Sequence, residues 1–214
     1  MAHTQRFNIL KARLRELRKR MLPSIFSPTG NYSDRQKDHA RGYRLLAHAE
    51  IESYVEDAAR EVIFKALRDW TLTQKPSKTI VAFMSCYHSS WRPDDTNAQD
   101  EVLRLARNRK CIADNAKEIL DAASNQYIEQ LKNNHGIRTK NLQRILVPAG
   151  IDLTTLDQTW LTNIDTFGEL RGRVAHNSAA RVTESIDPKT EYDRVKGLLE
   201  GLKNLDEMLE GLMN

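Results

Sequence analysis

Two side chains with clear chemical potential lie in the stretch Leu170-Arg171-Gly172-Arg173-Val174-Ala175-His176-Asn177. Arg171 carries a permanent cation, and His176 carries an imidazole that can exchange a proton near neutral pH. Together they form a minimal set for breaking a phosphodiester bond, because one group holds the phosphate charge while the other moves a proton. A structural interpretation is also open: Arg171 could pair with Glu50 or Glu52 inside a helical bundle, and His176 could complete a helix end.

Helix geometry constrains this pair. Residues five positions apart on a regular α-helix differ by about 140° around the axis and by about 7.5 Å along it. Arg171 and His176 would therefore not lie side by side on one regular helix. Two arrangements would bring them together: a local irregularity, which Gly172 favours as a poor helix residue, or a site built from two subunits.

The elements that must position the pair are predicted to be helices. Apolar residues recur at helical spacing, and the expected helices cover residues 4–21, 34–70, 98–133, 139–147, 160–176 and 192–212. On the second of these, His48 and Glu52 lie one turn apart on one face. The apolar run at residues 80–84 is predicted to be a brief strand or a buried loop, which periodicity cannot distinguish. The fold class is all-α.

Two helix ends carry recognisable signals. Gly136 follows the expected helix over residues 98–133, where a left-handed C-terminal cap is favoured. Thr154 or Thr155 is the expected N-cap of the helix that carries the Arg171–His176 pair.

Composition and motifs narrow the class of protein. The chain has 214 residues, of which 40% are hydrophobic and 29% charged, with 9 Gly and 6 Pro, as is typical of soluble helical proteins. Cys86 and Cys111 have no partners at metal-ligand spacing, and no signal peptide or membrane-spanning run is present, so a cytoplasmic location is expected. A glycine-rich phosphate loop, a convincing metal-nuclease carboxylate pair and a Gly-x-Ser-x-Gly elbow are also missing, so we expect no metal and no cofactor.

Positive charge is concentrated near the N-terminus. The net charge is only +4, but residues 6–20 contain seven basic residues and a single acid, Glu16. This stretch is predicted to be either a solvated helix face or a surface that contacts phosphates. For the second possibility, the candidate RNA-binding residues are Arg13, Arg15, Arg18 and Lys19.

Three stretches, taken in order, indicate a family. The sequence from Leu170 to Asn177 resembles the Arg-x4–6-His signature of HEPN domains, a helical superfamily of RNases and nucleotide-binding modules. The segment from Tyr43 to Glu52, and the stretch from His135-Gly136-Ile137 to Gly150-Ile151-Asp152, resemble the RiboL-PSP-type branch. The resemblance covers roughly residues 35–210 and leaves the basic N-terminal helix outside. It implies a HEPN-like antiparallel bundle over residues 34–214, preceded by an extra amphipathic helix and loop over residues 1–33.

The resemblance also implies an activity. Members with this motif dimerise so that two Arg–His helices face each other, and they cut RNA without a metal by attack of the ribose 2′-hydroxyl on the adjacent phosphate. Arg171 and His176 would be the catalytic residues. This chain departs from the family at Gly172, where a polar residue often follows the arginine, so the supporting polar groups are expected to be Glu50, Arg173 and Asn177.

Two functions follow from these observations. In the first, the protein is a homodimeric, metal-independent endoribonuclease of host defence or a toxin-type system, with the basic N-terminal helix adding RNA affinity and with an antitoxin or regulatory protein as a further partner. In the second, it is a non-catalytic HEPN-like module that binds nucleotide, RNA or a partner protein.

Overall fold

The computed structural model describes residues 4–88, 112–176 and 186–214, and this part of the chain is all-α as predicted. Its α-helices are α1 (Gln5–Met21), α2 (Asp34–Thr73), α3 (Lys78–His88), α5 (Ile112–Lys132), α6 (Thr139–Leu146), α7 (Gln158–His176) and α8 (Pro188–Met213), with a short 3-10 turn at Leu153–Thr155. Within the described residues there is no strand, and no helix is long and apolar enough to cross a membrane.

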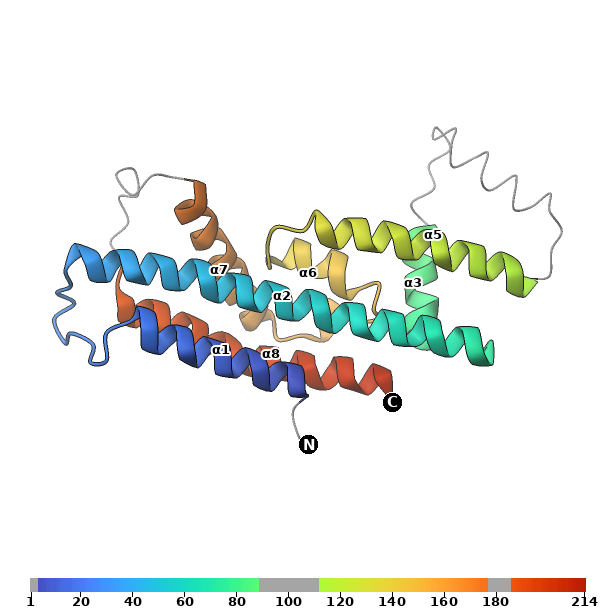
Figure 1. Ribbon diagram of the computed structural model, residues 1–214, viewed down its shortest axis with the longest axis horizontal. Helices are drawn as coiled ribbons and strands as arrows, with labels where there is room; N and C mark the ends of the chain where they lie inside the picture. Colours follow the sequence, from blue (N-terminus) through green and yellow to red (C-terminus); the bar gives the residue numbers. More distant parts are fainter. Residues whose placement is uncertain (1–3, 89–111, 177–185) are drawn as a thin grey trace.

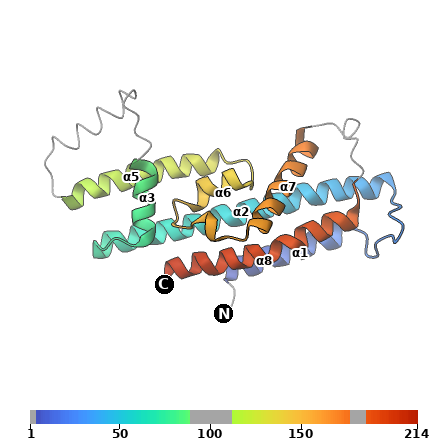
Figure 2. The ribbon, with the colours of Figure 1, turned by 180° about the vertical axis from the view of Figure 1, so that it is seen from behind.

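The 40-residue helix α2 forms the axis of the molecule (Figure 1). It begins with a capping box, in which the Ser33 side chain accepts a hydrogen bond from the Gln36 backbone and the Gln36 side chain accepts one from the Ser33 backbone. It ends at Gln74, which adopts a left-handed conformation. Helix α2 contacts α1, α3, α5, α6, α7 and α8. In both ribbon views α1 and α8 run along one side of α2, and α5 and α6 lie on the other side (Figure 2).

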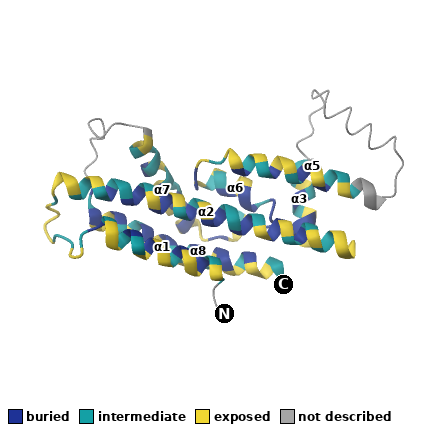
Figure 3. Ribbon diagram, in the orientation of Figure 1, coloured by how far each residue is buried: buried dark blue, intermediate teal, exposed yellow. Residues whose placement is uncertain are grey.

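Helix α1 shares the common hydrophobic core. Its buried face, with Phe7, Leu10, Leu14 and Leu17, packs against α2 and α8, and the same buried surface continues into the other helices (Figure 3). Helix α1 therefore packs on the main body of the domain. The division after residue 33 stays a prediction, while the core itself is continuous across it.

The prediction for residues 80–84 was wrong, because this run belongs to helix α3. The Ser77 hydroxyl accepts a hydrogen bond from the Ile80 backbone at 3.2 Å and so caps the first turn. Ile80 and Phe83 are buried while Val81 is 55% exposed, which is a helical rather than an alternating pattern. The capping serine before the apolar run is the signal that distinguishes helix from strand here.

The expected cap at Gly136 was also wrong. Among the described residues only Gly30, Gln74 and Gly150 have positive φ. The last turn of α5 is closed instead by the Asn133 side chain, which donates to the Glu129 carbonyl at 2.9 Å. Of the expected helix over residues 98–133, the first part lies outside the described residues.

Helix α7 begins later than its predicted cap. Thr154 and Thr155 lie in the 3-10 turn, and the carboxylate of Asp157 accepts hydrogen bonds from the backbones of Thr159 and Trp160 at 2.7 and 3.2 Å. Asp157 is therefore the cap that starts the helix bearing Arg171.

Candidate functional site

Helix α7 is uninterrupted from Gln158 to His176, and Gly172 lies within it. The irregularity considered at Gly172 is thus not found. On this regular helix the Cα positions of Arg171 and His176 diverge by about 140° and about 7.5 Å. His176 is the last residue of α7. A single α7 helix therefore does not bring the two residues together by its own geometry.

Arg171 lines a pocket of about 500 Å³ that we call the α6–α7 pocket. Its wall combines one residue of α2, the turn that links α5 to α6, residues from the first and last turns of α6, and one face of α7. The lining residues are His48, Asn133, His135, Gly136, Arg138, Lys140, Asn141, Arg144, Gly168, Glu169, Arg171 and Gly172.

The α6–α7 pocket is strongly cationic. Four permanent cations line it, against one carboxylate, Glu169, which is itself engaged by Arg173 at 2.6 Å. Within the described part of the chain, the guanidinium and ammonium groups of Arg138, Lys140, Arg144 and Arg171 form no ion pair. The structural interpretation in which Arg171 pairs with Glu50 or Glu52 is therefore not what the structure shows. Unpaired cations around one hollow favour an anionic ligand.

A buried histidine closes the α2 side of this pocket. His48 is 1% exposed and packs beside Phe167, with 6.0 Å between ring centroids. Its Nδ1 atom lies 3.5 Å from a Glu52 carboxylate oxygen, as their one-turn spacing predicted, but this atom has no hydrogen bond in the structure. A buried imidazole nitrogen without a hydrogen bond lowers the stability of the fold unless a polar group reaches it.

Asn134 fixes the turn between α5 and α6. Its amide nitrogen donates to the carboxylates of Glu52 and Glu56 at 3.2 and 2.7 Å, and its amide oxygen accepts from Asn141 at 2.9 Å. Burial raises the pKa of Glu56 above its usual range. This network ties the turn to α2 on one side and to α6 on the other, which holds the cations of α6 beside α7.

The position of α7 is fixed immediately before Arg171. Arg44 is buried on α2, and its guanidinium donates two hydrogen bonds of 2.7 Å to the buried carboxylate of Glu191 on α8. The same guanidinium donates to the carbonyl of Leu170 at 3.1 Å. One planar fork thus joins three helices at the residue that precedes Arg171.

The predicted supporting residues are placed differently from one another. Glu50 accepts a hydrogen bond from Arg13 at 3.1 Å and does not line the α6–α7 pocket. Arg173 is exposed and pairs with Glu169 one turn earlier on α7. Asn177 lies outside the described residues.

Comparison with known families identifies the chain. The family model described as RiboL-PSP-HEPN matches residues 8–211. The chain belongs to the RiboL-PSP-HEPN family. The match begins inside α1, so the family resemblance reaches further toward the N-terminus than the three motifs indicated. No curated protein and no solved structure matches the chain. Membership of a HEPN-type family indicates a nuclease or an RNA-related function.

The basic face of α1 in this RiboL-PSP-HEPN domain is partly used for folding. Arg13 pairs with Glu16 at 2.6 Å as well as with Glu50. Arg18 donates to two backbone carbonyls of the following loop, and its guanidinium lies 4.8 Å from the ring centroid of Phe26. Arg15 and Lys19 are exposed. Of the four candidates, these last two present their charge to solvent.

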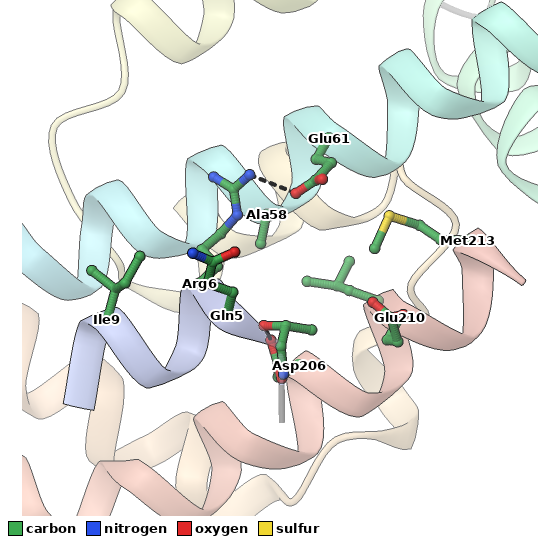
Figure 4. A pocket seen from close by; sticks show the side chains of 10 residues that line it. Gln5, Arg6, Ile9, Ala58, Glu61, Asp206, Glu210 and Met213 are labelled. Carbon is green, nitrogen blue, oxygen red and sulfur yellow. Dashed lines mark hydrogen bonds and ion pairs between the residues drawn. The ribbon is translucent and has the colours of Figure 1, made fainter. Parts of the chain in front are cut away.

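A second hollow of about 370 Å³ lies between α1, α2 and α8 (Figure 4). Four of the polar residues that line it bond to one another or to a neighbour: Arg6 donates to Glu61 at 2.5 Å, and Asp206 accepts from the Thr4 backbone, the Thr4 hydroxyl and the Tyr54 hydroxyl. These contacts join α1 to the other two helices and account for the buried carboxylate. Among the described residues, no group of three His, Cys, Asp or Glu side chains is arranged to hold a metal ion.

The pocket cations were not identified from the sequence of this RiboL-PSP-HEPN domain, although a signal for them exists. Between Glu129 and Asp152 the chain contains four cations and no carboxylate: Lys132, Arg138, Lys140 and Arg144. A stretch of this kind, adjoining the turn that resembles the family, indicates a positive surface. Only the packing of α6 on α7 shows that three of these cations gather around Arg171.

Proposed function

We propose that the protein is a metal-independent endoribonuclease whose active site combines Arg171 and His176 at a homodimer interface. The observation that carries this proposal is the position of Arg171. Arg171 forms no ion pair within the described residues, it opens onto the cationic α6–α7 pocket, and it lies five residues from the histidine that ends α7. Family membership supports an RNA-related role for this helix.

The proposed reaction needs only a proton carrier and a charge stabiliser. The ribose 2′-oxygen bonds to the adjacent phosphorus and loses its proton, while the bond from phosphorus to the 5′-oxygen breaks and that oxygen gains a proton. The products are a 2′,3′-cyclic phosphate and a 5′-hydroxyl. His176 would accept or deliver these protons, since an ordinary imidazole titrates near pH 6.5. Arg171 would hold the non-bridging oxygens through its planar fork.

The regular course of α7 favours a site shared between subunits. Because Arg171 and His176 diverge on one helix, we propose that the arginine of one subunit and the histidine of its partner meet at one phosphate. Glu50, Arg173 and Asn177 remain the proposed supporting residues. The α1 cations would add backbone affinity, with Arg15 and Lys19 best exposed for that role. A cytoplasmic setting in host defence or a toxin-type system, with an antitoxin or regulatory partner, completes the proposal.

The test is cleavage of single-stranded RNA in the presence of EDTA. We expect Arg171→Ala and His176→Ala each to lower the rate by about 100-fold or more, because each removes a group that acts in the transition state. Arg68→Ala is the matched control, since Arg68 is an exposed arginine on α2 away from the α6–α7 pocket, and it should keep the wild-type rate. Product ends should be 2′,3′-cyclic phosphates. An EDTA-resistant activity that survives in both variants would refute the assignment.

The uninterrupted α7 also favours one competing function. A monomer in which one regular helix separates the positions of Arg171 and His176, with Gly172 offering no polar side chain, could bind RNA without cutting it. Such a non-catalytic module would bind RNA in a binding measurement. In the cleavage assay it would leave the RNA intact at every concentration of EDTA or magnesium.

A further inference from the structure

The α6–α7 pocket is lined by three cations in addition to the proposed catalytic Arg171. Arg138 at the N-cap of α6, Lys140 in its first turn and Arg144 in its last turn bring three further cations to it, and none of the three has an ion-pair partner in the described part of the chain. All three are exposed, so their charges are not needed to compensate buried carboxylates. Cations held together without counter-charges repel one another, and an anionic ligand would relieve that repulsion.

Three contacts hold this charge cluster in place. The stem of Arg138 packs on Gly168 of α7, where an added Cβ would lie 2.8 Å from the Arg138 Cγ atom. The Thr139 backbone donates to the Asp165 carboxylate at 2.5 Å, which joins the first turn of α6 to α7. Asn141 bonds to Asn134 in the preceding turn. These contacts fix the cations on one side of the pocket, and the buried His48 side chain, whose Nδ1 atom lies 3.5 Å from a Glu52 carboxylate oxygen, closes the α2 side.

We propose that this wall binds backbone phosphates of the RNA strand next to the bond that is cut, with Arg138, Lys140 and Arg144 as the contacting residues. The identity of the ligand as RNA rests on the proposed function, whereas the affinity for phosphate rests on the pocket. Four cations surround a volume of about 500 Å³ that opens beside Arg171, so a strand entering the pocket passes the proposed catalytic arginine. We assign the site to the backbone rather than to particular bases, because the permanent charges that line it are four cations and a single carboxylate.

The experiment measures binding of a 20-nucleotide single-stranded RNA with 2′-O-methyl groups, which lacks the attacking hydroxyl and so stays intact. The pocket variant is Arg138→Gln, Lys140→Gln and Arg144→Gln combined. Glutamine retains the β and γ carbons, so the packing of residue 138 on Gly168 is preserved. The matched control, Arg35→Gln, Arg68→Gln and Lys75→Gln combined, removes the same charge from exposed positions at the two ends of α2.

We expect the pocket variant to lose about tenfold or more in affinity at moderate salt, and the slope of log K against log salt to fall in magnitude by about 2, since each lost phosphate contact on a single strand contributes about 0.7. The control should keep most of the wild-type affinity and slope. The variant Arg138→Lys, Lys140→Arg and Arg144→Lys combined retains the charges and should bind like wild type. Equal losses in the pocket variant and the control would overturn the proposal.

Two further measurements distinguish RNA binding at this pocket from nucleotide binding there, and RNA binding from RNA cleavage. Titration with ATP asks whether the pocket serves a free nucleotide instead: ATP binding that depends on the three cations, with RNA affinity unchanged, would overturn the assignment. Cleavage of unmodified RNA in EDTA is scored on the same proteins. Pocket-dependent RNA binding without any cleavage would support the phosphate site and refute the nuclease. Cleavage by a protein whose RNA binding does not depend on the three cations would support the nuclease and refute the phosphate site.

Discussion

At the scale of single residues, the buried ion pair of Arg44 and Glu191 fixes the position of α7 next to the proposed catalytic Arg171. Both side chains are 2% exposed, and they are joined by two hydrogen bonds of 2.7 Å. A guanidinium stays charged under all ordinary conditions, so Arg44 cannot escape its burial by losing a proton. Its third contact, with the Leu170 carbonyl, attaches α7 to the pair one residue before Arg171.

Removing only the acid should therefore be costly. We expect Glu191→Leu to lower the free energy of unfolding by about 3–5 kcal/mol, because it leaves the Arg44 charge buried without a carboxylate. The double variant Arg44→Met with Glu191→Leu should recover most of that loss, since neither charge then remains. Urea unfolding followed by circular dichroism measures both.

Glu200→Leu is the control for this pair. Glu200 is an exposed carboxylate on the same helix, and its loss should change the unfolding free energy by about 0.5 kcal/mol or less. If Glu191→Leu proved as mild as Glu200→Leu, the buried pair would not be the anchor of α7 that its geometry indicates.

At the scale of helices, the sequence predicted the elements whose signals are local. Helix α2 was predicted from its long apolar stripe and the absence of proline, and its predicted end at residue 70 lies within one turn of the observed Thr73. The Ser33 cap found in the structure is a further local signal. Helix α3 was missed because the run at residues 80–84 is apolar throughout, so its period is hidden and only Ser77 reveals the cap.

The candidate site was predictable only in part, for the same reason. Arg171 and His176 are neighbours in sequence, so spacing alone pointed to them. The α6–α7 pocket instead gathers His48, the cations of α6 and its N-cap, and Arg171 from separate segments. Their meeting depends on α6 packing against α7, a tertiary contact that no periodicity in the chain encodes.

The crossing of α7 and α8 provides a matched pair of substitutions. Gly201 lies against the indole of Trp160, where an added Cβ would fall 2.3 Å from the ring, whereas a Cβ at Gly197 would meet nothing within 4 Å. We expect Gly201→Ala to lower the free energy of unfolding by about 1–3 kcal/mol through overpacking of the buried ring. Gly197→Ala should raise it by about 0.5–1 kcal/mol, since alanine is the better helix residue.

Thermal unfolding of the two variants measures the difference, with opposite shifts of the midpoint expected from the same chemical change on one helix. A similar shift in both would mean that α7 and α8 do not approach as closely as the Trp160 side chain indicates. The hydrogen bond of 3.0 Å from the Trp160 indole to the Leu198 carbonyl fixes the ring, so it cannot turn away to admit the methyl group.

At the scale of the whole molecule, the end of α7 projects from the body of its own subunit. In both ribbon views this end extends away from the layer formed by α1, α2 and α8 (Figures 1 and 2). Arg173 and Ala175 are exposed there and Val174 is only half-buried, whereas Ile164 and Phe167 earlier on the helix are fully buried. A second copy packed on this end by two-fold symmetry would bring two α7 termini together.

Mixing two inactive variants tests that arrangement directly. If each site takes Arg171 from one subunit and His176 from the other, a dimer of Arg171→Ala with His176→Ala retains one intact site and one doubly defective site. Random exchange makes half of the dimers mixed, so activity should return to about a quarter of the wild-type value in EDTA. If both residues of a site came from one subunit, the mixture would stay inactive.

The control for the mixing experiment is the same pair of variants without subunit exchange. Each protein is first covalently cross-linked as its own dimer, and light scattering confirms the dimeric mass before mixing. Activity should then remain at the level of the separate variants. Recovery despite cross-linking would point to contamination, and absence of any dimer at micromolar concentration would contradict the shared site. The mixture without cross-linking distinguishes a shared site from a site within one subunit. The regular geometry of α7 favours the shared site, because one uninterrupted helix holds the positions of Arg171 and His176 about 140° apart within each subunit.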